Sequence, residues 1–266
     1  MADKKNYERL SEHIGLFPIV LIAPNDTDLI REGSEERRKF FDGVLSQAEN
    51  GFLNALIRYN KILNQRNGLL KLFGERNYLD EDLLETYNEP IIELAETIYN
   101  FRKSFMERFL PLFQKHYRFL STGKEQVSIA YESELAASDF PKVFRKNKSR
   151  DLHAQRTLKG PHKDEFVFEI DGNSVKKFGS QGQQKSFVIA MKLAQFELLK
   201  QEKKKTPILL LDDIFDKLDD KRINRLIELI DTGFLEQVFI TDARPERSQR
   251  ILEKVRAEVQ FFEIQN

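Results

Sequence analysis

Two adjacent carboxylates, Asp212 and Asp213, follow the apolar run 208–211 and are the residues best placed to do chemistry. Four branched apolar residues between a proline and charged residues predict a short, buried strand. Ligands of parallel sheets bind at the carboxyl ends of the strands. A carboxylate pair there suits Mg²⁺ beside a phosphate, with the second acid turned toward a water molecule. The alternative is a strand end capped by two solvated acids.

A polar, glycine-containing segment at residues 179–186 precedes this strand. It nearly fits the phosphate-binding loop GxxxxGK[ST], but Gln184 stands where that loop needs glycine. It also fits the signature loop of the ABC ATPase superfamily, [LG]-S-x-G-Q, which presents a hydroxyl and backbone N–H groups to a nucleotide held by a partner subunit. A third interpretation is a polar turn in which Ser180 caps a helix.

The order of the segments favours the signature loop. One helix of about 20 residues separates it from the paired aspartates, and residues 216–219 then resemble the D-loop pattern [ST]-x-L-D. A phosphate loop normally opens a domain, well before the metal-binding strand. The sequence therefore predicts signature loop, helix, metal-binding strand and D-loop in succession.

Composition excludes several classes of protein. The 266 residues include 43 basic and 43 acidic side chains, so a net charge of zero argues against a general nucleic-acid coat. Without cysteine there is no disulfide framework or thiolate metal site, and four scattered histidines do not form a zinc cluster. No apolar run approaches the ~18 residues of a membrane span. We expect a soluble, cytoplasmic protein.

Periodicity predicts the elements that position these residues. From Thr27 a helical pattern continues for most of a hundred residues, loosened between Gly68 and Gly74, and the aromatic stripe along 101–117 is typical of helix core. A hairpin is expected around Asp171-Gly172-Asn173. The other expected elements are strands at 17–23, 127–131, 166–170, 174–178, 237–241 and 259–264, and helices at 80–113, 136–153, 186–200, 219–230 and after Pro245.

Alternation of strands and helices in the last hundred residues predicts an α/β fold with parallel strands. The architecture expected from the pattern is a helical lobe inserted before an α/β half. The loops resemble those of the ABC ATPase superfamily, and this resemblance implies a P-loop NTPase of the ABC/SMC-like type, a partial ATPase lobe with an inserted helical lobe II. The expected divisions are residues 1–26 for a remnant of lobe I, 27–125 for lobe II, 126–178 for the rest of lobe II and the returning hairpin, and 179–266 for the C-terminal ATPase half.

Longer strings resemble one family more closely. Residues 156–164 (RTLKGPHKD) resemble the RT-x-x-GPHRDD block of the RecF family of recombination-mediator ATPases. Similar matches occur in four further stretches, at 17–26, 33–42, 180–186 and 210–213. The chain is therefore identified as resembling the RecF family over nearly its whole length.

This resemblance implies a DNA-binding ATPase of recombinational repair, replication-gap processing and the SOS response, with RecO and RecR as partners. It implies head-to-tail homodimers around ATP and Mg²⁺. Asp212 would hold the metal, and Asp213 would occupy the place of the water-activating acid. Ser180, Gly182 and Gln183 would contact the partner's ATP, and Asp219 would belong to the D-loop.

The sequence departs from the family pattern in three ways. No segment forms a good phosphate loop, so we expect the chain to bind ATP weakly or not at all. The switch histidine is replaced by Thr241 and Asp242, and the segment that often carries a nucleotide-sensing glutamine reads Ala23-Pro-Asn-Asp26. We interpret the chain as lobe II and the C-terminal part of a RecF-like ATPase that is shortened at its N-terminus.

DNA contact is assigned to Arg145, Lys146 and Lys148, which lie in a basic stretch on an expected helix. A solvated face is the alternative, and His162 in the GPH block receives no catalytic role. Two other functions stay open: a non-catalytic module that binds DNA or a partner, and a different SMC-like or overcoming-lysogenization-type ATPase.

Overall fold

The structure is a computed structural model that describes residues 14–121, 125–136, 139–213, 219–253 and 255–263. The chain divides into two compact units. The helical unit consists mainly of Glu32–Leu110 and Ser128–Phe168, and the sheet unit consists of Leu16–Arg31, Pro111–Val127 and Glu169–Asn266. The four divisions expected from the sequence stay a prediction.

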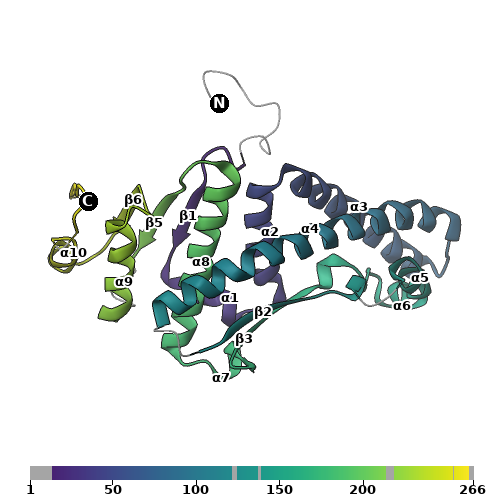
Figure 1. Cartoon of the computed structure of the whole chain (residues 1–266). Helices are drawn as coiled ribbons and strands as arrows, with labels where there is room; N and C mark the ends of the chain where they lie inside the picture. Colours follow the sequence, from purple (N-terminus) through teal and green to yellow (C-terminus); the bar gives the residue numbers. More distant parts are fainter. Residues whose placement is uncertain (1–13, 122–124, 137–138, 214–218, 254, 264–266) are drawn as a thin grey trace, which may run out of the picture. The chain divides into compact units, whose positions relative to one another are not determined.

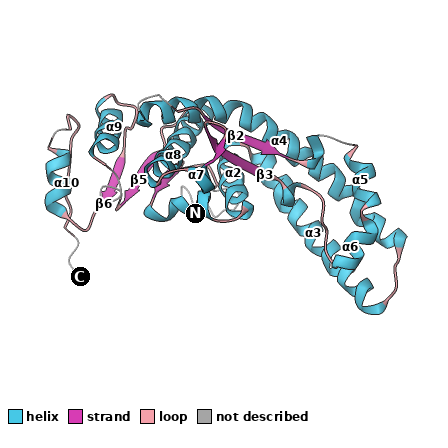
Figure 2. Ribbon diagram, turned by 90° about the horizontal axis from the view of Figure 1, so that it is seen from below, coloured by secondary structure: helices cyan, strands magenta, loops and turns pink. Residues whose placement is uncertain are grey.

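A three-stranded parallel sheet organises the sheet unit (Figure 1). Its order is β1 (Ile19–Ile22), β5 (Ile208–Asp212) and β6 (Val238–Thr241), with Val20 opposite Leu209 and Leu209 opposite Val238. Figure 2 shows β5 and β6 side by side. The expected buried strand and its parallel neighbours are therefore confirmed.

One face of this sheet is covered and the other is not. Val20, Ile22, Leu209 and Leu211 are buried, and α8 (Gln181–Lys203) packs against β1. On the opposite face Ile19, Leu21 and Phe239 are 43%, 46% and 50% exposed. Parallel sheets normally bury both faces, so this apolar face lacks a covering layer within the described residues.

The longest helix that lies wholly within the sheet unit is α8, and the unit's other helices are short. Ser180 caps α8, whose apolar residues are buried on every side, as expected for a helix inside a core. The others are α1 (Asp28–Arg31), α7 (Val175–Phe178), α9 (Asp220–Asp231), α10 (Pro245–Leu252) and the 3₁₀ turn η2 (Pro24–Thr27).

Long helices build the helical unit, and aromatic rings fill its core. Phe41 lies 4.1 Å from Phe166 between ring centroids and makes edge contacts with Phe105 and Phe109. The elements are α2 (Ser34–Ala48), α3 (Asn50–Arg76), α4 (Glu81–Ser121, shared with the sheet unit), α5 (Phe140–Lys146), α6 (Lys148–Ala154) and the 3₁₀ turns η3 (Glu134–Ala136) and η4 (Pro161–Lys163). The aromatic stripe is core, as predicted: Phe105, Phe109, Phe113 and Tyr117 are at most 1% exposed.

A second sheet has the order β2 (Val127–Glu132), β3 (Glu165–Ile170) and β4 (Asn173–Ser174). The expected hairpin is confirmed between β3 and β4, with Asp171 and Gly172 at φ values of 50° and 73°. Two consecutive residues with positive φ form the turn that matches strand twist.

Four expectations about the elements are wrong. Residues 175–178 form α7 rather than a strand, because the lysines leave only one buried side chain, Val175, to hold a sheet position. The looser stretch between Gly68 and Gly74 is continuous helix within α3, since buried Leu70 and Phe73 anchor it. The helix expected over 136–153 is divided into α5 and α6 at Asn147. Residues 259–263 form no strand, and Ile264 lies outside the described residues.

A buried arginine, Arg102 on α4, joins separate segments of the helical unit. It donates to both oxygens of Asp42, each at 2.9 Å, and to Asp164 Oδ2 and the Pro161 carbonyl oxygen, both at 2.8 Å. Tyr131 donates to the same Asp164 oxygen at 2.6 Å. Burial alone would lower the pKa of Arg102, but Asp42 and its other partners raise it above its ordinary value.

We predict that Arg102→Met destabilises the protein by about 3–5 kcal/mol, because two carboxylates lose their buried counter-charge. Urea-induced unfolding followed by circular dichroism measures the change. Lys39→Met serves as the control, since Lys39 forms exposed ion pairs with Glu35 and Glu36 that contribute at most about 1 kcal/mol. Equal stability losses in the two variants would show that the buried network does not hold the unit together.

Candidate ATPase half-site

The paired aspartates lie at the carboxyl end of β5, where Thr241 at the end of β6 contacts both. Thr241 Oγ1 donates to Asp212 Oδ1 at 2.6 Å, and the Asp213 N–H donates to the Thr241 carbonyl oxygen at 3.0 Å. Asp213 has a positive φ of 45°, at which the strand ends. Thr241, one of the residues in the place of the switch histidine, therefore positions Asp212.

The chemistry of the two carboxyl groups fits a divalent cation and a water molecule. Asp212 is exposed, so its second oxygen is accessible to a hard cation such as Mg²⁺. Asp213 Oδ1 is buried and has no hydrogen-bond partner among the described residues, although a buried acceptor normally has one. Within that part of the chain no group of three His, Cys, Asp or Glu side chains could hold a metal. Further ligands would be water or phosphate oxygens.

The residues predicted to form the signature loop, Ser180, Gly182 and Gln183, lie in a closed turn at the start of α8, which we call the signature turn. Ser180 Oγ accepts from the Gln183 N–H at 3.2 Å, and Gln183 Oε1 accepts from the Ser180 N–H at 2.7 Å, which is a capping box. Gln183 Nε2 also donates to Glu125 Oε1 at 2.8 Å, and Tyr117 donates to the other oxygen of Glu125. The turn is therefore held in place from α4.

Arg222 on α9 links the signature turn to Asp219, the residue that the family resemblance assigns to the D-loop. Its Nε donates to Ser186 Oγ at 2.6 Å and its Nη2 to the Gly182 carbonyl oxygen at 3.0 Å. Its Nη1 pairs with Asp219, which also caps α9 by accepting from the Arg222 N–H at 3.0 Å. A Cβ at position 182 would lie 3.3 Å from Nη2, so glycine allows this close approach. Residues 216–218 of the D-loop pattern lie outside the described residues.

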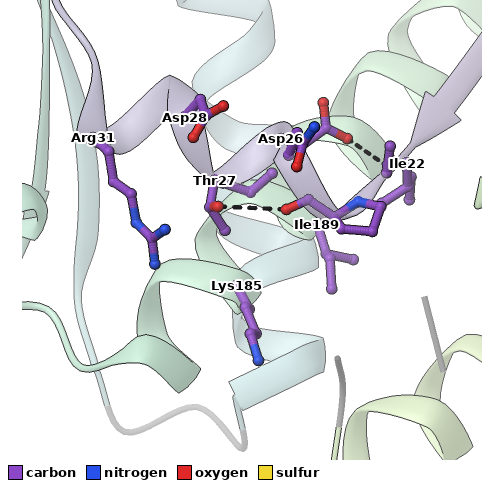
Figure 3. A pocket seen from close by; sticks show the side chains of 11 residues that line it. Ile22, Asp26, Thr27, Asp28, Arg31, Lys185 and Ile189 are labelled. Carbon is purple, nitrogen blue, oxygen red and sulfur yellow. Dashed lines mark hydrogen bonds between the residues drawn. The ribbon is translucent and has the colours of Figure 1, made fainter. Parts of the chain in front are cut away.

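A cavity of about 340 Å³ lies at the end of β1. Its lining includes residues 23–26, the segment that often carries a nucleotide-sensing glutamine in related ATPases. Arg31 and Lys185 are among the side chains that line it (Figure 3). Asp26 is engaged, since Oδ2 accepts from the Ala23 N–H at 2.8 Å and Oδ1 pairs with Lys192 at 2.7 Å. Asp26 therefore stabilises the turn after β1.

The GPH block is a structural element of the helical unit. His162 Nε2 lies 3.0 Å from the Thr157 carbonyl oxygen, which can only accept, so Nδ1 accepts from the Tyr59 hydroxyl at 2.7 Å. Burial lowers the pKa of His162 to about 4, which keeps the ring neutral. Gly160 has φ +128°, and a Cβ there would lie 2.6 Å from Tyr59 Oη. His162 is thus a packed turn residue.

Two of the residues assigned to DNA already have acidic partners. Arg145 Nε lies 2.7 Å from Glu85 Oε1, and Lys148 Nζ lies 2.7 Å from Glu81 Oε1. Lys146 is exposed. Their role in DNA binding stays a prediction.

Sequence reasoning missed two residues that organise this half-site, Arg222 and Glu125. Arg222 stands three residues after Asp219, a helical spacing that could have indicated an ion pair. Glu125 is separated from Gln183 by 58 residues, so no local pattern could reveal their contact.

No protein-family model matches the chain. Among curated proteins it is 50% identical over 247 residues to the DNA replication and repair protein RecF of Cytophaga hutchinsonii, covering 93% of this chain and 66% of that protein. It is 45% identical over 260 residues to the protein of the same name from Flavobacterium johnsoniae, covering 98% and 72%. The chain thus spans about two thirds of the length of these relatives.

Comparison with solved structures also finds RecF proteins. The recombination mediator protein RecF-ATPrS in the RecFOR pathway aligns with a TM-score of 0.81 and 29% identity over 90% of this chain and 66% of that one. The RecF-ATP structure aligns with a TM-score of 0.77 and 28% identity over 87% and 64%. These matches confirm the predicted ABC/SMC-like fold class. The described residues contain no helix long and apolar enough to cross a membrane.

We predict that Arg222→Ala loosens the signature turn, because Ser186 and the Gly182 carbonyl lose charged donors worth roughly 1.5–3 kcal/mol each. Hydrogen–deuterium exchange followed by mass spectrometry should be faster in peptides covering residues 180–190. Arg225→Ala on the same helix is the control, since Arg225 pairs with Glu228 at the surface. Unchanged exchange in Arg222→Ala would show that the turn does not depend on this arginine.

We predict that His162 makes stability pH-dependent. Its pKa is about 4 when folded and about 6.5 when unfolded, so the unfolded chain binds more protons between these values and stability falls as pH decreases from 6.5 to 4. The loss is on the order of 3 kcal/mol. His162→Gln should remove it from urea titrations made across this range.

The exposed His153 provides the control, because His153→Gln should leave the pH dependence unchanged. The raised pKa of Asp164, caused by burial, acts in the opposite direction but is present in every variant and cancels in the comparison. A His162→Gln protein with the wild-type pH profile would contradict a buried, neutral histidine.

Proposed function

The chain belongs to the RecF family of DNA replication and repair proteins, and we propose that it is the helical-lobe and C-terminal part of a DNA-binding ATPase of recombinational repair. In the complete protein it would form an ATP-dependent homodimer on DNA and act with RecR- and RecO-type partners in the cytoplasm. The observation that carries this proposal is the joint presence of the Asp212–Asp213 strand end and the closed signature turn in one α/β unit.

Asp212 would hold Mg²⁺ in this proposal, and the ion would offset the negative charge of the phosphates. Thr241 donates to one oxygen of Asp212 and so orients the other. The buried, unpaired Oδ1 of Asp213 would accept a hydrogen bond from the attacking water and align it.

Ser180, Gly182 and Gln183 would contact the nucleotide of a partner subunit, with Asp219 beside them. The capping box and Arg222 hold this turn in shape without a nucleotide, so little ordering entropy would be lost on binding. The Gln183 side chain already donates to Glu125. The donors that the turn can offer to a nucleotide are therefore the Ser180 hydroxyl and the free backbone N–H groups at the start of the helix.

The phosphate-gripping half of the site would come from additional polypeptide. The sequence contains no good phosphate loop, and the chain matches 66% and 72% of two curated relatives. The exposed apolar face of Ile19, Leu21 and Phe239 is a surface that such polypeptide could cover. Alone, the chain would bind ATP poorly.

A non-catalytic module is the second candidate. The preformed signature turn favours it, because this turn could complete the ATP site of another subunit without hydrolysis by the chain itself. The two candidates therefore share one prediction.

We predict that the chain binds Mg-ATP with a Kd above about 1 mM, yet associates with a full-length RecF-family protein only when ATP is present. Isothermal titration calorimetry measures the first property and analytical ultracentrifugation the second. Ser180→Arg should abolish association by filling the nucleotide-facing turn. Ser174→Arg, outside the turn, should not.

Tight ATP binding by the chain alone would contradict the missing phosphate-gripping half. ATP-independent association, or none, would contradict the signature assignment. Asp212→Asn should leave ATP-dependent association unchanged, because in this proposal Asp212 serves the nucleotide of its own subunit.

A further inference from the structure

Basic residues are concentrated in one segment of the helical unit. Residues 140–156, which include α5 and α6, contain six lysines and arginines and a single carboxylate, Asp151, although the chain as a whole has no net charge. Asp151 is fully buried against Arg66, at 2.8 Å from its Nη1. Five of the six basic side chains, all except Arg156, divide into two groups with different surroundings.

The inner group docks this segment onto α4. Arg145 pairs with Glu85 and Glu89, and Lys148 pairs with Glu81, so an acidic row with four-residue spacing on α4 is matched by cations. Burial would raise the pKa of Glu85, but hydrogen bonds from Asn88 and Arg145 keep it below its ordinary value. Contact between these cations and another anion would require breaking the ion pairs.

The outer group is Lys142, Lys146 and Arg150, all exposed and without an ion pair in the described part of the chain. They are spaced four residues apart. Helical hydrogen bonds continue across the junction, from the Asn147 N–H to the Val143 carbonyl and from the Asp151 N–H to the Asn147 carbonyl. The three cations therefore form one stripe. Nearby Asp139 is occupied in capping α5.

The length of the stripe suits a phosphate backbone. Eight residues at 1.5 Å each span about 12 Å, the axial length of roughly three to four phosphates on one DNA strand. The aromatic residues of the segment, Phe140 and Phe144, are buried at 2% and 0% exposure and cannot stack on bases. Single-strand binders normally use such stacking, so the surface favours a duplex.

We propose that Lys142, Lys146 and Arg150 bind the phosphate backbone of duplex DNA, and that Arg145 and Lys148 do not. This inference rests on the proposed DNA-binding function and assigns it to a surface. It replaces the sequence-based choice of Arg145 and Lys148 and keeps Lys146.

Two double variants remove the same charges from the two groups. Lys142→Gln/Arg150→Gln changes the outer stripe, and Arg145→Gln/Lys148→Gln changes the inner group. Fluorescence anisotropy with a labelled duplex, measured between 50 and 300 mM salt, gives the slope of log Kd against log salt. The outer variant should reduce this slope by about 1.8, since each lost phosphate contact removes about 0.9. The inner variant should leave the slope unchanged.

The variant Lys142→Arg/Arg150→Lys keeps both positive charges and should therefore keep the wild-type slope. Thermal melts of every variant show whether each one is still folded. A wild-type slope in the outer variant, or an equal reduction in the inner one, would overturn the surface assignment alone. Tighter binding to a single strand of the same sequence would contradict the proposal that duplex DNA is the ligand of this surface. Absence of salt-dependent DNA binding by the wild-type chain would overturn the proposed DNA function together with this inference.

Discussion

Burial of the Arg102 guanidinium constrains how separate segments of the helical unit come together. A charge removed from water requires matched partners, and Arg102 finds them in Asp42, Asp164 and the Pro161 carbonyl. These partners come from distant parts of the chain, so the network fixes where the GPH block lies against α2 and α4. The GPH block, one of the strings that resemble the family, therefore serves structure here, and the contact between Tyr59 and His162 extends the same role.

In the sheet unit the equivalent constraint is the covered face of the parallel sheet. Packing of α8 on β1, which pairs with β5, brings the signature turn and the paired aspartates into one compact unit. Their hydrogen-bond partners differ: Arg222 and Glu125 hold the turn, whereas Thr241 holds Asp212. If these residues serve ATP hydrolysis as proposed, they are already held in place without a nucleotide, which is the condition for electrostatic preorganisation.

Charged residues on the helical unit are sorted by their neighbours. Cations that face the acidic row of α4 form ion pairs with it, while those on the opposite side remain exposed to solvent. Net charge and basic runs in a sequence cannot separate these roles, because the separation depends on which helix packs against which. The same segment therefore contains both structural ion pairs and a candidate phosphate-binding stripe.

The sequence by itself determined the α/β class, the parallel strands, the signature turn and the paired aspartates, because short-range periodicity and motif order carry that information. It also indicated that the aromatic stripe is core. Tertiary structure decided the rest. The helical state of 175–178, the continuity of α3, and the partners of Arg102, Arg145 and Gln183 all depend on side chains distant in sequence, whose burial or pairing outweighs local preference.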